Sequence, residues 1–124
     1  MYYKDLEVWK EARKLVVEVY KLTAAFPPNE IYGLASQIKR AVVSIPSNIA
    51  EGCNRYSDRD TNKFIDIALG SIAELDTQLI IAEDLNYIKY NKDIIDMVNK
   101  VSALLQGLKK YLNNNSGEII NNKL

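Results

Sequence analysis

The sequence predicts an all-α protein, an up-down-up-down bundle of four helices. Four segments carry apolar residues at helical spacing, and short stretches rich in Pro, Asn and Gly separate them. No segment shows the strict alternation of a strand. Long helices with short connections pack most simply as antiparallel neighbours. Because 124 residues suit one hydrophobic core, we expect a single domain at residues 1–115 and a frayed tail at 116–124.

The first two helices are separated by the stretch "FPPNE". The first is expected over residues 5–25, where Leu6, Trp9 and Val16 begin its apolar face. Two prolines cannot continue a helix, and Asn29 is placed to cap the next one. The second helix is therefore predicted to begin near Glu30.

The third helix is predicted to open at "SDRD". Ser57 can cap it, and Asp60 stands where the acid of a capping box belongs. The pattern breaks at "LNYIKYN", and a fourth apolar face then runs from Ile94 to Leu112. The stretch "NNNSGE" is predicted to close this last helix.

Within the second helix, "SIPSNIAEG" contains the least helical residues of an otherwise periodic segment. Pro46 has no N–H for the carbonyl of Val42, which predicts a kink. Ser47 and Asn48 lie close enough to supply donors to a freed carbonyl. Three interpretations stay open: repair of the kink and packing, which we prefer; contact with a ligand or nucleic acid; and, least favoured, catalysis.

The composition bounds the function. The chain has no histidine and one cysteine, so the commonest general base is missing and a zinc site or disulfide cannot be built within it. We expect no enzyme activity, no metal and no cofactor. The charged N-terminus and the lack of a long apolar run predict a cytoplasmic protein with no membrane partner. A formal net charge of zero argues mildly against nucleic-acid binding by bulk charge.

The apolar faces are wider than a four-helix monomer needs. The first helix is apolar at Val8 and Trp9, and again at residues 15–17. The second and third helices carry "AVVSI" and "IDIALGSIAEL", which also exceed a single stripe. We therefore predict a homo-oligomer.

Three motifs carry a family resemblance: "YGLASQIKRA", "SIPSNIAEG" and "GSIAELDTQL". With them the chain, from Leu6 to about Leu112, resembles a bacterial four-helix-bundle family first noticed as reading frames inside 23S rRNA intervening sequences. The resemblance implies a barrel-shaped homopentamer and no enzymatic activity. A related branch, the accessory variability determinant of diversity-generating retroelements, binds nucleic acid and a reverse transcriptase.

The resemblance also implies structural roles for the motif positions. We expect these residues to shape the second helix, its packing or a subunit interface, with Gly70 and Ser71 allowing close helix approach. The positions are Arg40, Pro46, Ser47, Asn48, Glu51, Gly52 and Gly70.

A basic end is the candidate functional surface. The topology brings the end of the second helix and the loop after it near the start of the first helix and the end of the fourth. The predicted phosphate contacts are Arg55, Arg59, Lys63, Lys109 and Lys110, with Lys4 and Lys10 nearby. Tyr56 and Tyr111 could offer stacking faces. Acidic neighbours could instead neutralise these cations; they are Asp5, Glu7, Glu11, Glu51, Asp58 and Asp60.

The main hypothesis is a non-enzymatic, homo-oligomeric module that contacts RNA or DNA through this end. The alternative is a protein-interaction scaffold, for example one that docks a reverse transcriptase, without nucleic-acid binding of its own. Under the main hypothesis, replacement of Arg55 and Arg59 by alanine should weaken binding to all nucleic-acid sequences and flatten its salt dependence, and an unchanged affinity would contradict it.

Overall fold

Four α-helices make up most of the described part of the chain. The computed structural model describes the backbone of residues 1–123 and the side chains of residues 1–114. The helices are α1 (Glu7–Thr23), α2 (Leu34–Cys53), α3 (Asp58–Asp84) and α4 (Lys92–Lys123), with short 3-10 turns η1 (Tyr3–Asp5) and η2 (Pro28–Glu30). The backbone of residues 1–123 contains no strand. The prediction of an all-α fold is confirmed.

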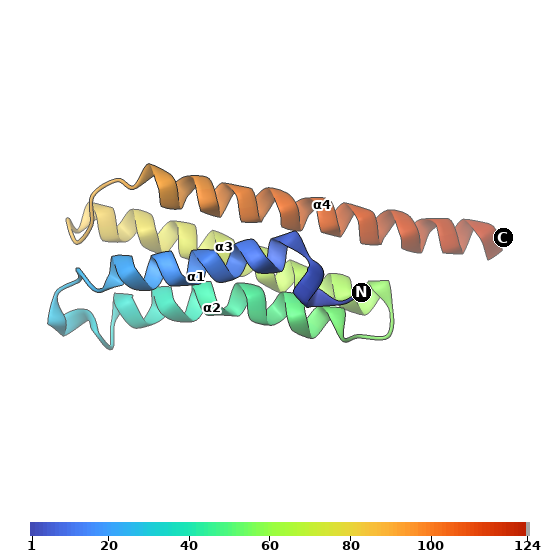
Figure 1. Cartoon of the computed structure of the whole chain (residues 1–124), viewed down its shortest axis with the longest axis horizontal. Helices are drawn as coiled ribbons and strands as arrows, with labels where there is room; N and C mark the ends of the chain where they lie inside the picture. The colour runs from blue at the N-terminus through green and yellow to red at the C-terminus, as the bar shows by residue number, and fades with distance from the viewer. Residues whose placement is uncertain (124) are drawn as a thin grey trace.

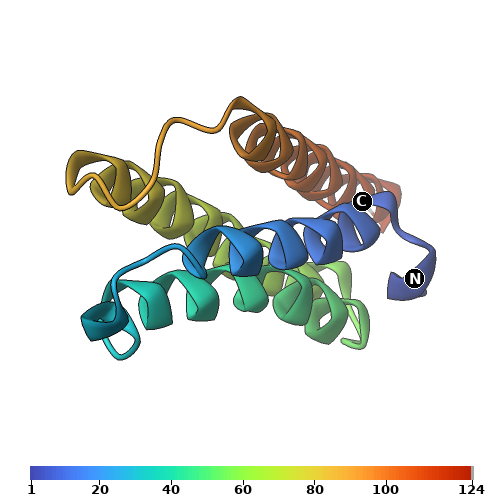
Figure 2. The ribbon, with the colours of Figure 1, turned by 60° about the vertical axis from the view of Figure 1, so that its left-hand side comes forward.

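Each helix packs against two others. α1 contacts α2 and α4, and α3 contacts the same two helices. Successive helices run in opposite directions along the molecule (Figure 1), and the connection from α3 arches over to the start of α4 (Figure 2). The arrangement is a four-helix bundle. The chain start, the α2–α3 turn and the second half of α4 lie toward the same end, at the right of Figure 1.

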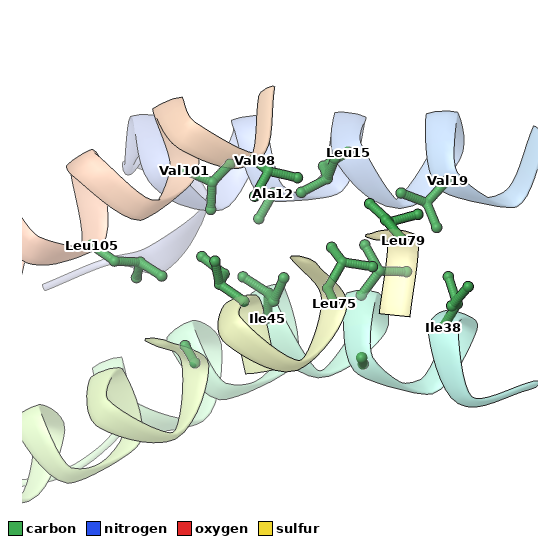
Figure 3. Packing of buried hydrophobic residues seen from close by; sticks show 14 of the residues in the cluster. Ala12, Leu15, Val19, Ile38, Ile45, Leu75, Leu79, Val98, Val101 and Leu105 are labelled. Carbon is green, nitrogen blue, oxygen red and sulfur yellow. The ribbon is translucent and has the colours of Figure 1, made fainter. Parts of the chain in front are cut away.

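The core lies along the axis of the bundle and receives side chains from every helix. Leu15 of α1, Ile45 of α2, Leu75 of α3 and Leu105 of α4 are fully buried. In Figure 3 these side chains, together with neighbours such as Val101, point into the space between the helices. Burial of a side chain of this size stabilises the fold by about 1.5–3 kcal/mol.

The start of α3 matches its sequence prediction, but the start of α2 does not. Ser57 caps α3, its hydroxyl accepting from the N–H of Asp60 at 3.2 Å. Asn29, predicted to cap α2, lies instead in the η2 turn, and α2 begins only at Leu34. There the carboxylate of Glu30 accepts from the N–H of Leu34 at 2.8 Å and so performs the capping.

α3 ends in a Schellman motif. Asn86 adopts a positive φ of 60°, which asparagine tolerates better than other residues with a side chain. The N–H of Tyr87 donates to the carbonyl of Ala82 and the N–H of Asn86 to that of Glu83, each at 2.9 Å. Phe26 packs on the Tyr87 ring, with 5.5 Å between centroids. The break predicted at "LNYIKYN" is thus a defined helix end.

α4 is longer than predicted. The sequence pattern placed its end at the Asn and Gly residues after Leu112, whereas the backbone is helical through Lys123. The predicted frayed tail at 116–124 lies outside the residues whose side chains are described.

Candidate nucleic-acid interface

The motif around Pro46 is built into α2. Pro46 is buried, and α2 is helical from Leu34 to Cys53 on both sides of it. The Ser47 hydroxyl donates to the carbonyl of Val43 at 2.8 Å, and the Asn48 amide donates to that of Ser44 at 2.7 Å. These bonds correct one expectation: the two side chains bind the carbonyls that follow Val42, not the carbonyl that Pro46 leaves without its donor.

Gly52 is the motif residue with the clearest structural reason. A Cβ at this position would lie 2.8 Å from the Cβ of Phe64 and 3.1 Å from the carbonyl oxygen of Thr61. The Thr61 hydroxyl in turn donates to the carbonyl of Gly52 at 2.8 Å. Gly52 therefore allows α2 and α3 to approach closely just before the turn that joins them.

Gly70 does not serve close approach within the chain. It is exposed on α3, and a Cβ built there meets nothing within 4 Å. Its neighbour Ser71 is buried and accepts a hydrogen bond from Ser44 of α2. The approach expected of both residues is therefore made by Ser71 alone, and the assignment of Gly70 to a subunit interface stays a prediction.

The basic end brings cations together from several elements. Arg55 lies in the turn between α2 and α3, Arg59 is the second residue of α3, and Lys63 follows in the first turns of that helix. Lys109 reaches α3 through an ion pair with Asp66, Nζ to Oδ1 at 2.6 Å. Lys110 is exposed beside it on α4. The start of α3 and the second half of α4, far apart in the sequence, thus share one surface.

Three of the five predicted cations pair with carboxylates of this chain. Besides Lys109 with Asp66, Arg55 lies 3.1 Å from Glu51 and Lys63 lies 3.5 Å from Asp60. All three pairs are substantially exposed, and such pairs contribute about 0–1 kcal/mol. Glu51 and Asp60 were expected to neutralise cations here, whereas Asp66 was not.

Two cations and two aromatic rings on this surface are open to solvent. Arg59 and Lys110 are exposed, and neither forms an ion pair with any side chain among residues 1–114. Tyr56 in the turn is fully exposed and Tyr111 on α4 is largely exposed. Arg55 stacks over Phe64, with its guanidinium carbon 4.4 Å from the ring centroid. The surface therefore presents both cations and exposed aromatic rings to the solvent.

A second basic surface was missed by sequence reasoning. A groove on the outer side of α1 is lined by Lys4, Trp9, Lys10, Arg13, Lys14 and Val17. Lys4 and Lys10 had been grouped with the basic end and with nearby acids in the sequence. The spacing of Lys10, Arg13, Lys14 and Val17, all on one face of a helix, could have revealed it.

Two acids of α1 pair with a lysine of α4. Lys100 of α4 lies 3.7 Å from Glu7 and 3.5 Å from Glu11. A hydrogen bond from Lys14, together with the charge of Lys100, lowers the pKa of Glu11 below its ordinary value. Glu7 and Glu11 therefore lie close to α4, whereas the residues that line the groove include no carboxylate.

Other kinds of site find little support. Within the described part of the chain, no three acidic or cysteine side chains gather so as to hold a metal ion. Burial raises the pKa of the Cys53 thiol, which disfavours the reactive thiolate. None of the helices described here is long and apolar enough to cross a membrane.

The fold and this surface define a class: small all-α, four-helix-bundle proteins with charged and aromatic side chains at one end. A family model described as 23S rRNA-intervening sequence protein matches residues 4–109. The chain belongs to this family, as the sequence motifs predicted.

The fold is similar to that of a solved structure. It is a protein of unknown function from the S23 ribosomal protein family of Bacteroides thetaiotaomicron, 21% identical, and the alignment covers 85% of this chain and 94% of that one with a TM-score of 0.60. No curated protein matches the chain significantly. These likenesses establish family and fold.

Proposed function

We propose that this protein is a non-enzymatic, homo-oligomeric module that binds RNA or DNA through the basic end. One observation carries the proposal: Arg55, Arg59, Lys63, Lys109 and Lys110 share one end of the bundle with the exposed rings of Tyr56 and Tyr111. Cations neutralise phosphates, and tyrosine rings stack on unpaired bases.

The ion pairs within the chain do not prevent this surface from binding phosphate. Each exposed pair contributes only about 0–1 kcal/mol, so a phosphate can replace the carboxylate at low cost. Phosphate binding also releases counterions, which favours association at low salt. Arg59 and Lys110 need no such exchange. Because carboxylates lie beside these cations, the affinity of a single basic end for nucleic acid is low.

Self-assembly compensates for a weak single surface. We propose the homopentamer implied by the family resemblance, in which five basic ends act together and avidity raises the overall affinity. Exposed apolar side chains between α1 and α2 support assembly. These are Tyr20, Ile31, Tyr32 and Val43, which line one groove together with Ser36, Lys39 and Arg40. A bend of α2 at Pro46, which we also propose, would shape this face.

A double variant tests the proposed surface. Arg55→Ala/Arg59→Ala removes two cations at the α2–α3 turn. We expect the affinity for labelled RNA and DNA to fall at least tenfold near 0.1 M salt for all sequences, because phosphate contacts carry no sequence information. Fluorescence anisotropy measures this.

Lys89→Ala/Lys92→Ala is the matched control. It removes the same charge from exposed lysines around the connection at the opposite end of the bundle. The control should bind as the wild type does. If the two double variants lose affinity equally, net charge and not the basic end governs binding, and the assignment is wrong.

A protein-interaction scaffold is the second candidate, favoured by the same apolar groove. Tyr32, one of the residues that line it, is almost fully exposed next to the exposed Ile31. Tyr32→Ser separates the two uses of the groove. A change in the mass of the oligomer assigns the groove to self-assembly, whereas an unchanged mass leaves it available for a partner protein.

A further inference from the structure

The groove on the outer side of α1 has its own charge pattern. It is an open surface depression of about 890 Å³, and it carries four cations and no carboxylate among its six lining residues. The chain as a whole has equal numbers of basic and acidic residues, so this segregation is local. A surface of one sign attracts a ligand of the opposite sign.

Two acids next to the groove along α1 are already paired. Glu7 and Glu11 pair with Lys100 of α4. Of the four cations of the groove, Lys14 alone shares its charge with Glu11, at 3.3 Å. No ion pair with a side chain of residues 1–114 involves Lys4, Lys10 or Arg13.

Arg13 is held in place within the groove. Its guanidinium carbon lies 4.8 Å from the centroid of the Trp9 ring. Trp9 is itself fixed by an edge contact with Tyr3, with 5.3 Å between centroids. A guanidinium held over an aromatic ring loses less freedom when its planar N–H groups bind a phosphate in bidentate fashion.

The position of the groove links it to the basic end. Lys4 precedes α1 and Lys10 lies in its second turn, at the end of the bundle that also holds the α2–α3 turn (Figure 1). We propose that the groove binds the phosphodiester backbone of a single nucleic-acid strand and continues the path of a strand held at the basic end. This inference rests on the proposed function.

Trp9 makes the groove directly observable, because it is the only tryptophan of the chain. The probe is a fluorescein-labelled oligouridylate, whose anisotropy reports binding anywhere on the protein. An unlabelled oligouridylate is titrated in parallel while Trp9 emission is recorded. A strand in the groove should change this emission to saturation at the same concentration that saturates the anisotropy.

The groove variant is Lys10→Gln/Arg13→Gln/Lys14→Gln, compared with Arg55→Ala/Arg59→Ala. Loss of three phosphate contacts should weaken binding at least tenfold and reduce the slope of log K against log salt by about 2, from about 0.7 per contact with a single strand. Lys10→Gln/Lys14→Gln keeps the Arg13–Trp9 stack and should act in the same direction. Circular dichroism verifies that each variant is folded.

The outcomes separate this inference from the proposed function. Unchanged binding by the groove variants, or an unchanged Trp9 emission at saturation, overturns the inference; loss of affinity in the Arg55/Arg59 variant would then leave the basic end standing alone. Loss of binding in the groove variants alone supports strand binding in the groove but removes the basic end, and it thereby overturns the shared path of the strand. A wild type that binds no oligouridylate even at low salt overturns both.

Discussion

At Gly52, α2 and α3 approach so closely that no side chain fits. Gly52→Ala gains about 1 kcal/mol of helix propensity but places a Cβ 2.8 Å from that of Phe64. Both contacts of the new Cβ are with rigid atoms, so overpacking should prevail. We expect a net loss of about 1–2 kcal/mol in the free energy of unfolding, measured by urea denaturation. A variant as stable as the wild type would show that the helices separate freely there.

Glu11 gives the fold a defined pH dependence. Its pKa is lowered in the folded state, chiefly by the hydrogen bond from Lys14. The stabilisation is therefore present above the ordinary glutamate pKa and is lost as the pH falls through the lowered value. Glu11→Gln should lower the free energy of unfolding at pH 7 by at most about 1 kcal/mol, as expected of a surface pair.

The check on Glu11 is a comparison of thermal unfolding of the variant and the wild type across pH. Their difference should vanish in acid, where both side chains are neutral. A difference that persists unchanged in acid would assign the effect to packing.

The start of a helix was predicted correctly where the capping residues lie within one turn of it. Ser57 and Asp60 lie within one turn of the start of α3, and the cap forms as expected. The start of α2 was misplaced because prolines 27 and 28 allow a 3-10 turn first, and Glu30 caps from four residues away. The length of α4 was underestimated since Asn and Gly weaken a helix without ending it.

Asn86 tests the end of α3. Its positive φ costs an ordinary side chain about 1–2 kcal/mol and glycine almost nothing. Asn86→Ala should therefore lower the free energy of unfolding by about 1 kcal/mol, while Asn86→Gly leaves it unchanged or raises it. Urea denaturation of both variants measures these changes in the free energy of unfolding. Equal destabilisation by alanine and glycine would mean that the asparagine side chain, and not its backbone conformation, matters.

For the whole molecule, the sequence predicted which elements share one end of the bundle but not how the charges there pair. Topology alone brought Arg55, Arg59 and Lys63 near Lys109. Whether each cation is free depends on side-chain rotamers, as in the pair of Lys109 with Asp66. The groove on α1 was missed for the same reason: Glu7 and Glu11 adjoin its cations in the sequence but turn toward Lys100 in space.

Gly70 and Gly107 test self-assembly. Both are exposed in helices, and a Cβ at either meets nothing within 4 Å of this chain. Each change to alanine should stabilise the isolated subunit by about 0.5–1 kcal/mol. If Gly70 lies in the subunit interface, only Gly70→Ala should also weaken the oligomer. Analytical ultracentrifugation across dilution measures this, and equal dissociation of both variants would contradict the interface.

The central claim is a phosphate-binding surface on the basic end, and the most direct test is a salt series. The wild-type protein is titrated with labelled structured RNA and with duplex DNA at several salt concentrations. We expect binding whose log K falls linearly with log salt, with a slope reduced by about 2 in Arg55→Ala/Arg59→Ala, from about 0.9 per contact with duplex DNA. The claim would be contradicted by a lack of binding at low salt, or by an affinity that does not change with the salt concentration.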